Sequence, residues 1–260
     1  SAASDVYKRQ DRALELESQL EQMGRSDLVR VVRRVGELAR IHYVRQTEPK
    51  GLGDAIATAA DHVGTEPFVV LLADDVLEPG AADLARMIEV AEMHACSVVA
   101  LAEVAPDQMS RYGCAEVARV PAGGCRCDGV VEITGLIEKP SPEVAPSNLA
   151  VVGRYVLDPM VMDILSRTES DARGEIQLTD ALDWLARHRR MLGVVLTQAR
   201  HDLGTLVDYQ LANLKRALAD PDLGPLVAEL LESLGWRRSE GSGSIARQPC
   251  SGSRHSGGQR

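Results

Sequence analysis

The chain has 260 residues, of which 45% are hydrophobic and 26% charged, a profile typical of a globular protein with one sizeable domain or two small ones. The formal charge of −9 disfavours nonspecific binding to nucleic acid or to an anionic membrane surface, and no apolar run approaches the length of a membrane span. Five cysteines argue against a disulfide framework, and 3% aromatic residues argue against base-stacking surfaces. We therefore expect a cytoplasmic protein with reduced thiols, in which an anionic substrate needs a locally basic pocket.

The N-terminal part of the chain predicts two helices behind a short leader. The first ten residues, SAASDVYKRQ, fit neither a helix nor a strand, and we expect residues 1–10 to be a non-native leader. From residue 11 to 38 apolar positions recur at steps of three and four among many charges, which is typical of amphipathic helix. A break near Gly24 divides this stretch into two helices.

Short apolar runs rich in β-branched residues alternate with helical stretches over much of the remaining chain. The predicted strands are residues 41–44, 68–72, 97–104, 130–137, 149–157 and 192–196. The predicted helices are residues 53–62, 81–94, 175–188 and 205–219. This alternation predicts an α/β fold with a mixed, mostly parallel sheet and helices on both faces. Two strand-like runs within residues 111–139 predict a β-rich excursion from the main sheet.

The last part of the chain differs in composition from the rest. Residues 237–260 are rich in Ser, Gly and Arg and carry five Arg against one Glu. This composition predicts a disordered basic tail. Such a tail can bind an acidic partner, but a solvated extension without function explains the same composition.

A glycine-containing turn joins the first predicted strand to the helix that follows it. Its sequence is KGLG at residues 50–53. Glycines let a ligand approach the backbone, and the amides at a helix start favour anions or hydrogen-bond acceptors. An ordinary strand-to-helix turn is the simpler explanation of two glycines by themselves, and the pattern lacks the three spaced glycines of a dinucleotide fingerprint.

Acidic residues follow two of the predicted strands. Asp74 and Asp75 follow the strand at 68–72, and Asp202 follows the strand at 192–196. At the carboxyl edge of a parallel sheet an aspartate can hold Mg²⁺, with phosphate and water completing the coordination. Two carboxylates from separate strand ends can share such a metal site, whereas a loop aspartate can equally cap the next helix.

An acid and a base stand side by side where the strand at 130–137 ends. Glu138 suits sugar hydroxyls and Lys139 suits a phosphate, although a surface ion pair explains the same two residues. Successive side chains of a strand face opposite ways, so a shared ligand requires a twist or bulge here, which Pro140 would mark.

Taken together, several segments resemble one family, the bacterial UTP–glucose-1-phosphate uridylyltransferases (UDP-glucose pyrophosphorylases), in order and spacing. The resemblance runs from about residue 11 to 234. The segments that carry it are VRQ at 44–46, KGLG at 50–53, LLADD at 71–75, RYG at 111–113, IEKP at 137–140, APSNLAVVGRY at 145–155, GEIQLTDA at 174–181, and Asp202 with Gly204.

The resemblance implies a Rossmann-like nucleotide-diphospho-sugar transferase fold, with a partial catalytic domain at residues 11–203 and C-terminal helices at 204–236. It implies a Mg²⁺-dependent enzyme of carbohydrate metabolism that converts UTP and glucose 1-phosphate to UDP-glucose and pyrophosphate, and that is a homo-oligomer. The implied roles are uracil contact for Gln46 and Gly51, Mg²⁺ binding for the catalytic Asp74 and Asp202, packing on the glucosyl ring for Gly113, sugar hydroxyl binding for Glu138, sugar phosphate binding for the catalytic Lys139, and lining of the sugar pocket for Val151, Gly153 and Tyr155.

The sequence departs from the family pattern at three places. We find neither the first strand with its G-x-G-T-R phosphate loop nor the P-K-x-M-L-P segment, so the resemblance implies an N-terminally truncated, poorly stable and inactive fragment. Asp54 stands where relatives usually have His, and Ala73 where they commonly have Pro. Two other hypotheses stay open: a noncatalytic sugar-nucleotide binding or regulatory protein, and a nucleotidyltransferase for another sugar 1-phosphate or base.

Overall fold

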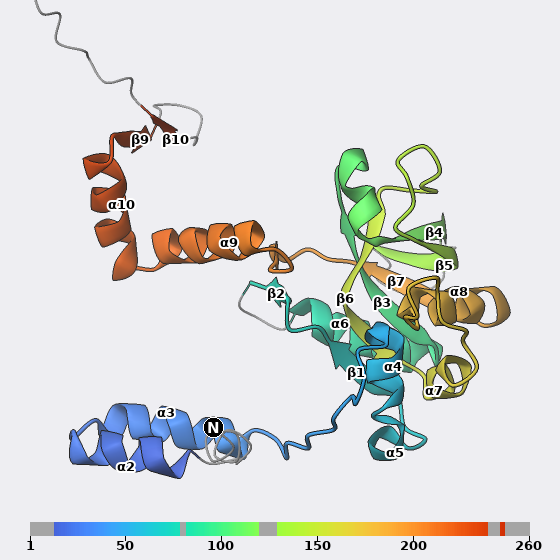
Figure 1. Cartoon of the computed structure of the whole chain (residues 1–260), viewed down its shortest axis with the longest axis horizontal. Helices are drawn as coiled ribbons and strands as arrows, with labels where there is room; N and C mark the ends of the chain where they lie inside the picture. The colour runs from blue at the N-terminus through green and yellow to red at the C-terminus, as the bar shows by residue number, and fades with distance from the viewer. Residues whose placement is uncertain (1–12, 79–81, 120–128, 239–244, 248–260) are drawn as a thin grey trace, which may run out of the picture. The chain divides into compact units, whose positions relative to one another are not determined.

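The computed structural model describes residues 13–78, 82–119, 129–238 and 245–247 (Figure 1). The chain forms two compact units. The helical unit comprises Ser1–Glu66 and Pro159–Leu182, and the sheet unit comprises Pro67–Asp158 and Asp183–Arg260. The leader expected at residues 1–10 lies outside the described residues, as does most of the expected tail. No described helix is both long enough and apolar enough to cross a membrane.

The helical unit begins with two helices packed as a hairpin (Figure 1). These are α2 (Leu14–Gln22) and α3 (Ser26–Glu37), and Gly24 between them has a φ of +71°, which confirms the predicted break. Arg33 of α3 ties the pair together, because its guanidinium bonds Glu17 at 2.8 Å and Glu21 at 2.5 Å.

The rest of the helical unit differs from the prediction in two respects. Residues 41–44 are not a strand and pair with no strand among the described residues, and their side chains are exposed. The helix expected at 53–62 is two short ones, α4 (Gly51–Ala57) and α5 (Ala60–Val63). The unit also holds α7 (Met160–Leu165) and the start of α8, which runs over Leu178–His188.

The sheet unit is built on a six-stranded sheet in the order β1-β6-β3-β7-β5-β4. Its strands are β1 (Phe68–Leu71), β3 (Ser97–Glu103), β4 (Gly113–Arg119), β5 (Val130–Glu138), β6 (Leu149–Leu157) and β7 (Met191–Val195). The mixed α/β class is confirmed, but only β3 and β7 pair in parallel among these strands. The parallel majority expected from strand–helix alternation is therefore wrong for the described sheet, because no α-helix separates β3, β4, β5 and β6 along the chain.

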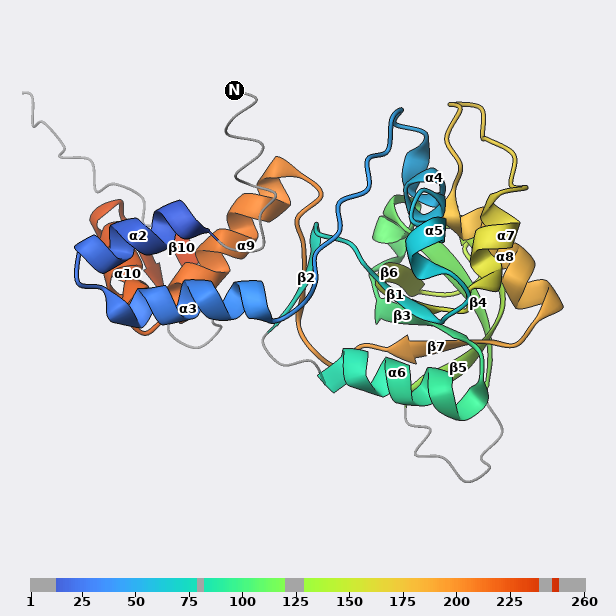
Figure 2. The ribbon, with the colours of Figure 1, turned by 90° about the horizontal axis from the view of Figure 1, so that it is seen from below.

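The core of the sheet unit lies between this sheet and α6 (Ala82–His94), which crosses one of its faces (Figure 2). Side chains of α6 and of the central strands share it, and all are buried: Met87, Val90, Val98, Ala100, Val130, Ala150, Val152, Val156, Leu192 and Val194. All but one of the residues of β6 are buried, which explains its nearly unbroken apolar sequence.

A two-stranded antiparallel ribbon accompanies the sheet. Its strands are β2 (Asp75–Leu77) and β8 (Arg200–Asp202), and Asp75 lies opposite Asp202. The chain then enters α9 (Leu206–Ala219) and α10 (Leu223–Ser233). Thr205 caps α9 by accepting the Asp208 N–H, so the helix starts where the sequence predicts it.

Two short strands reach into residues 237–260, for which the sequence predicts no regular structure. They are β9 (Trp236–Arg238) and β10 (Ile245–Arg247), which pair antiparallel.

Candidate functional site

The ribbon brings together the two acids that the sequence singled out as metal ligands. The Leu203 N–H donates to the Asp74 carbonyl oxygen at 2.7 Å. A Cβ atom added to Gly204 would lie 3.0 Å from Asp202 Oδ1 and 3.9 Å from Asp74 Oδ2. The two carboxylates therefore flank one glycine, although 127 residues separate them in the chain.

The two acids have different surroundings. Asp202 Oδ2 accepts the Tyr112 hydroxyl at 2.5 Å and faces Arg111 at 3.3 Å and Arg200 at 3.6 Å, while Oδ1 accepts the Gly204 N–H at 2.9 Å. Partial burial raises the pKa of Asp202, but these donors outweigh it and hold that pKa below its usual value.

Asp74 is exposed, and among the described residues its carboxylate makes no hydrogen bond or ion pair. It is therefore the carboxylate open to a ligand, whereas Asp202 is held in place by protein donors. Across the described part of the chain there is no cluster of three or more His, Cys, Asp or Glu arranged for a metal. A cation held by Asp74 and Asp202 would therefore take its other ligands from substrate and water.

Asp75, next to Asp74, is a residue whose importance the sequence did not reveal. Its side chain is only 5% exposed, and it accepts the Gly153 N–H at 2.7 Å and the Arg200 Nε–H at 2.8 and 2.9 Å. The Arg200 guanidinium also lies over the Tyr112 ring, 5.2 Å from its centre. This ion pair holds the ribbon to β6 and to the Tyr112 that supports Asp202.

We expect substitutions of the two neighbouring aspartates to differ in their effect on the free energy of unfolding. Asp75→Asn removes the nearer charge partner of the partly buried Arg200, which then keeps only the Asp202 carboxylate at 3.6 Å, and should lower the free energy of unfolding by about 3 kcal/mol. Asp74→Asn, at an exposed and unpaired position, should change it by no more than about 0.5 kcal/mol. Urea denaturation of both variants checks this, and equal losses would contradict the division of roles.

Three predicted sugar-pocket residues lie on β6. Val151 and Tyr155 are buried, at 8% and 6% exposure. Burial raises the pKa of the Tyr155 phenol, and the nearby carboxylates of Asp75 and Glu138 raise it further. A Cβ atom on Gly153 would lie 2.8 Å from both the Asp75 and the Leu72 Cβ atoms, so glycine is required here by packing.

Gly153→Ala should therefore destabilise the sheet unit. Neither neighbouring Cβ atom can move without its backbone, and we expect a loss of about 3 kcal/mol from overpacking. As a comparison in the same unit, Gly235→Ala places its methyl group in open space at a φ of +80° and should cost about 1 kcal/mol. Thermal or urea unfolding of both variants checks the difference, and a neutral Gly153→Ala would mean that β6 is not constrained as described.

Glu138 and Lys139 converge through an unusual backbone conformation. β5 ends at Glu138, and Lys139 has a φ of +45°, in the left-handed region that non-glycine residues rarely adopt. Its Nζ consequently lies 3.2 Å from Glu138 Oε1. The register pairs Glu138 with Gly113, and the Lys139 N–H donates to the Tyr112 carbonyl at 3.1 Å. The structure thus brings together Gly113, Glu138 and Lys139, through the twist that a shared ligand requires.

The two predicted uracil-contacting residues, Gln46 and Gly51, lie together in the helical unit. Gln46 Nε2 donates to the Gly51 carbonyl at 3.1 Å and to Asp54 Oδ2 at 2.7 Å. Gly51 and Gly53 both pack against Ile176, whose carbonyl oxygen would lie 2.8 and 2.7 Å from Cβ atoms added to them. Glycine at both positions is explained by this packing. The Ile176 N–H donates to Lys50 O at 2.7 Å, and Ile176 O accepts the Gly53 N–H at 2.9 Å.

Asp171 organises the loop that carries Ile176. Its carboxylate accepts the Arg173 N–H at 2.8 Å, the Glu175 N–H at 3.0 Å and a Gln177 side-chain N–H at 3.0 Å. These hydrogen bonds, that from Glu175 first, lower the pKa of Asp171 from its ordinary value. The loop explains why α8 starts at Leu178 and not at Glu175.

This pKa shift predicts how the loop responds to acid. A carboxylate with a lowered pKa in the folded protein stabilises the loop above its ordinary pKa, and that stabilisation is lost as the pH falls through the folded value. The chemical shift of the Glu175 amide should titrate with a midpoint below 3.8, and Asp171→Asn should remove this titration. A midpoint at or above 3.8 would contradict the loop's hydrogen bonding.

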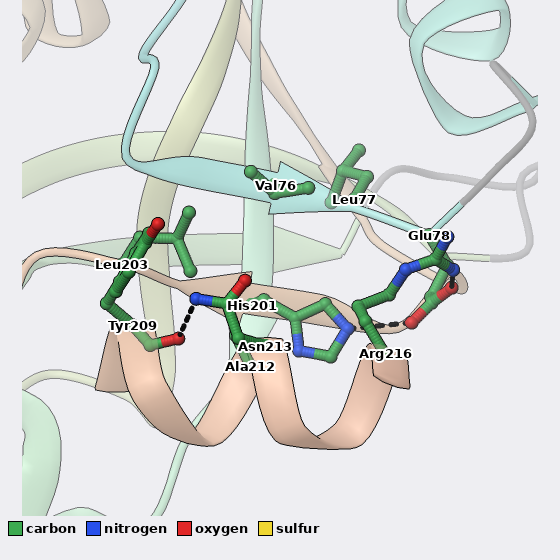
Figure 3. Close-up of a pocket in the computed structure, with 9 residues that line it drawn as sticks. All are labelled: Val76, Leu77, Glu78, His201, Leu203, Tyr209, Ala212, Asn213 and Arg216. Carbon is green, nitrogen blue, oxygen red and sulfur yellow. Dashed lines mark hydrogen bonds and ion pairs between the residues drawn. The ribbon is translucent and has the colours of Figure 1, made fainter. Parts of the chain in front are cut away.

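A cavity of about 280 Å³ lies in the sheet unit between the ribbon and α9 (Figure 3). Its walls are Val76, Leu77, Glu78, His201, Leu203, Tyr209, Ala212, Asn213 and Arg216. Glu78 contacts two side chains here, because His201 Nε2 lies 2.7 Å from its Oε1 and Arg216 Nη1 lies 3.3 Å from its Oε2. None of the predicted site residues lines this cavity.

Comparisons with known proteins point to one enzyme class. The profile of the nucleotidyl transferase family matches residues 8–217. UTP–glucose-1-phosphate uridylyltransferase YngB of Bacillus subtilis (strain 168) is 35% identical over 230 residues, covering 88% of this chain and 75% of the relative. The UTP–glucose-1-phosphate uridylyltransferase of Streptococcus pneumoniae serotype 4 is 36% identical over 234 residues, covering 88% and 76%.

Solved structures agree with these sequence relatives. A UTP-bound UGPase from Acinetobacter baumannii has a TM-score of 0.74 at 34% identity, covering 86% of this chain and 76% of its own. A UDP-glucose pyrophosphorylase complexed with UDP-glucose has a TM-score of 0.65 at 37% identity, covering 74% and 73%.

Proposed function

Because the chain belongs to the nucleotidyl transferase family, we propose that it acts as a UTP–glucose-1-phosphate uridylyltransferase, which joins UTP and glucose 1-phosphate into UDP-glucose and pyrophosphate. One observation in the sheet unit supports this most directly. Tyr112 donates its hydroxyl to Asp202 and accepts the Lys139 N–H on its carbonyl. A single residue therefore connects Asp202, one of the two acids expected to hold a metal, with the lysine expected to hold the sugar phosphate.

We assign Mg²⁺ binding to Asp74 and Asp202. Carboxylate oxygens are the ligands this cation prefers, and the exposed Asp74 carboxylate has no competing partner among the residues described. When bound, Mg²⁺ would supply positive charge to the phosphates of UTP. On this chain, Tyr112, Arg111 and Arg200 orient Asp202.

The sugar phosphate is assigned to the cluster at the end of β5. Lys139 provides a positive charge for the phosphate, and Glu138 accepts hydrogen bonds from sugar hydroxyls. Gly113 lies beside Glu138 in the register and is assigned to packing on the glucosyl ring. In the helical unit, Gln46 and Gly51 are assigned to the uracil edge. The buried Val151, Gly153 and Tyr155 shape the sugar side of the site from β6.

In the proposed reaction the protein acts mainly by positioning the two substrates. An oxygen of the glucose 1-phosphate dianion forms a bond to the α-phosphorus of UTP, and the bond from that phosphorus to the bridging oxygen breaks in line with it. Pyrophosphate leaves with the bonding electron pair, so no covalent enzyme intermediate is required. The residues named here bind and orient the two polyanions, and Lys139 offsets part of their charge. A homo-oligomeric state belongs to the same proposal and rests on the resemblance, and a cytoplasmic location belongs to it as the expectation from the sequence.

Replacing Asp74 tests the assignment. Asp74→Asn should lower the rate of pyrophosphate release from UTP, glucose 1-phosphate and Mg²⁺ by about 100-fold or more, because it removes a charged oxygen ligand while leaving the fold intact. Asp61→Asn, at an exposed position on α5, should keep the unsubstituted rate.

The assay is run on this chain and on the same chain extended by a family-type phosphate loop, and the Asp74 comparison is made in the form that turns over. Full turnover by Asp74→Asn would refute its assignment as a metal ligand. Release with dTTP or galactose 1-phosphate in place of the proposed substrates would move the activity to another nucleotidyltransferase.

A further inference from the structure

The orientation of the Gln46 side-chain amide is fixed by two acceptors. Gln46 Nε2 donates one hydrogen to the Gly51 carbonyl at 3.1 Å and the other to Asp54 Oδ2 at 2.7 Å. A primary amide has two donor hydrogens and one acceptor oxygen. Both donors are therefore used within the helical unit, and Oε1 makes no hydrogen bond to any residue that the structure describes.

The reverse orientation of this amide is disfavoured. An ionised carboxylate only accepts hydrogen bonds, and so does a backbone carbonyl. Turning the Gln46 amide over would bring Oε1 against the Asp54 carboxylate and the Gly51 carbonyl, so three oxygens would meet without a hydrogen. Asp54 contributes the charged and shorter of the two hydrogen bonds, which makes it the stronger constraint.

The surrounding backbone keeps both acceptors in place. Gly51 has a φ of +91° and packs on the Ile176 carbonyl, and Ile176 is bonded to Lys50 and Gly53 on either side. Asp54 belongs to α4, and its own carbonyl accepts the Thr58 N–H at 2.9 Å. The two acceptors of the Gln46 side-chain amide are therefore held in fixed positions by backbone contacts.

We propose that Asp54 is a specificity-determining positioning residue, which makes Gln46 present only its carbonyl oxygen to the base. The inference rests on the proposed function, which assigns Gln46 to the uracil edge. Uracil carries a hydrogen on N3 and can donate it to Oε1. Cytosine has an unprotonated N3 at the same place, whose lone pair would face the lone pairs of Oε1. A site built to accept this hydrogen discriminates strongly against a base that lacks it.

Binding of two sugar nucleotides tests this role. Isothermal titration of the chain with UDP-glucose and with CDP-glucose gives two dissociation constants, and we expect a clear preference for UDP-glucose. Asp54→Asn keeps the shape of the side chain, but an asparagine can donate as well as accept, so both amide orientations become available. The preference should fall by about tenfold or more, because UDP-glucose binds more weakly and CDP-glucose more tightly. Asp61→Asn is the matched control and should keep the unsubstituted preference.

The orientation itself is measured without ligand. In ¹⁵N-labelled protein the side-chain NH₂ signals of Gln46, identified by their loss in Gln46→Leu, should shift in Asp54→Asn and not in Asp61→Asn. Signals unchanged by Asp54→Asn would overturn the inference. So would an unchanged preference for UDP-glucose in that variant, which leaves the proposed function standing. Failure of the unsubstituted chain to bind UDP-glucose at all would reject the proposed function and this inference together.

Discussion

The ion pair between the buried Asp75 and the partly buried Arg200 is the contact on which the candidate site of the sheet unit depends. It joins β2 to β8, and Asp75 also accepts the Gly153 N–H, so the ribbon is fixed to β6. This contact also sets the positions of the two candidate metal ligands. Asp74 precedes Asp75 in the chain, and Asp202 lies opposite Asp75 in the ribbon. A buried ion pair adds little net stability over apolar packing, and we attribute its role to setting the position of the ribbon.

Residues that are adjacent in this chain have different structural roles, as Asp74 and Asp75 show. Asp75 points into the protein and holds the scaffold, while Asp74 is exposed and open to a ligand. Successive side chains of a strand point to opposite faces, but Lys139 has a left-handed backbone conformation. Its side chain therefore lies on the same side as that of Glu138 and pairs with it. Backbone strain of this kind persists where surrounding contacts fix it, and it is frequent at functional sites.

Local chemistry made part of this structure predictable. The start of α9 follows from Thr205, whose hydroxyl accepts the Asp208 N–H, and both residues lie within one turn. Arg200 could not be assigned, because its partner Asp75 lies 125 residues away and no periodicity records their pairing. Residues 41–44 have the composition of a strand, but a strand forms only where another strand lies beside it to pair with. Composition does not show whether such a partner is present. The mixed order of the sheet likewise depends on long-range pairing that strand and helix alternation does not determine.

Under the proposed function, a sugar nucleotide binds in the sheet unit at the end of β5 and beside Gly153. The most direct test is a ¹H–¹⁵N titration of the chain with UDP-glucose. We expect the amide signals of Gly113, Lys139 and Gly153 to shift together with one dissociation constant. Shifts confined to His201 and Asn213, which line the cavity between the ribbon and α9, would contradict this binding site and place the ligand elsewhere.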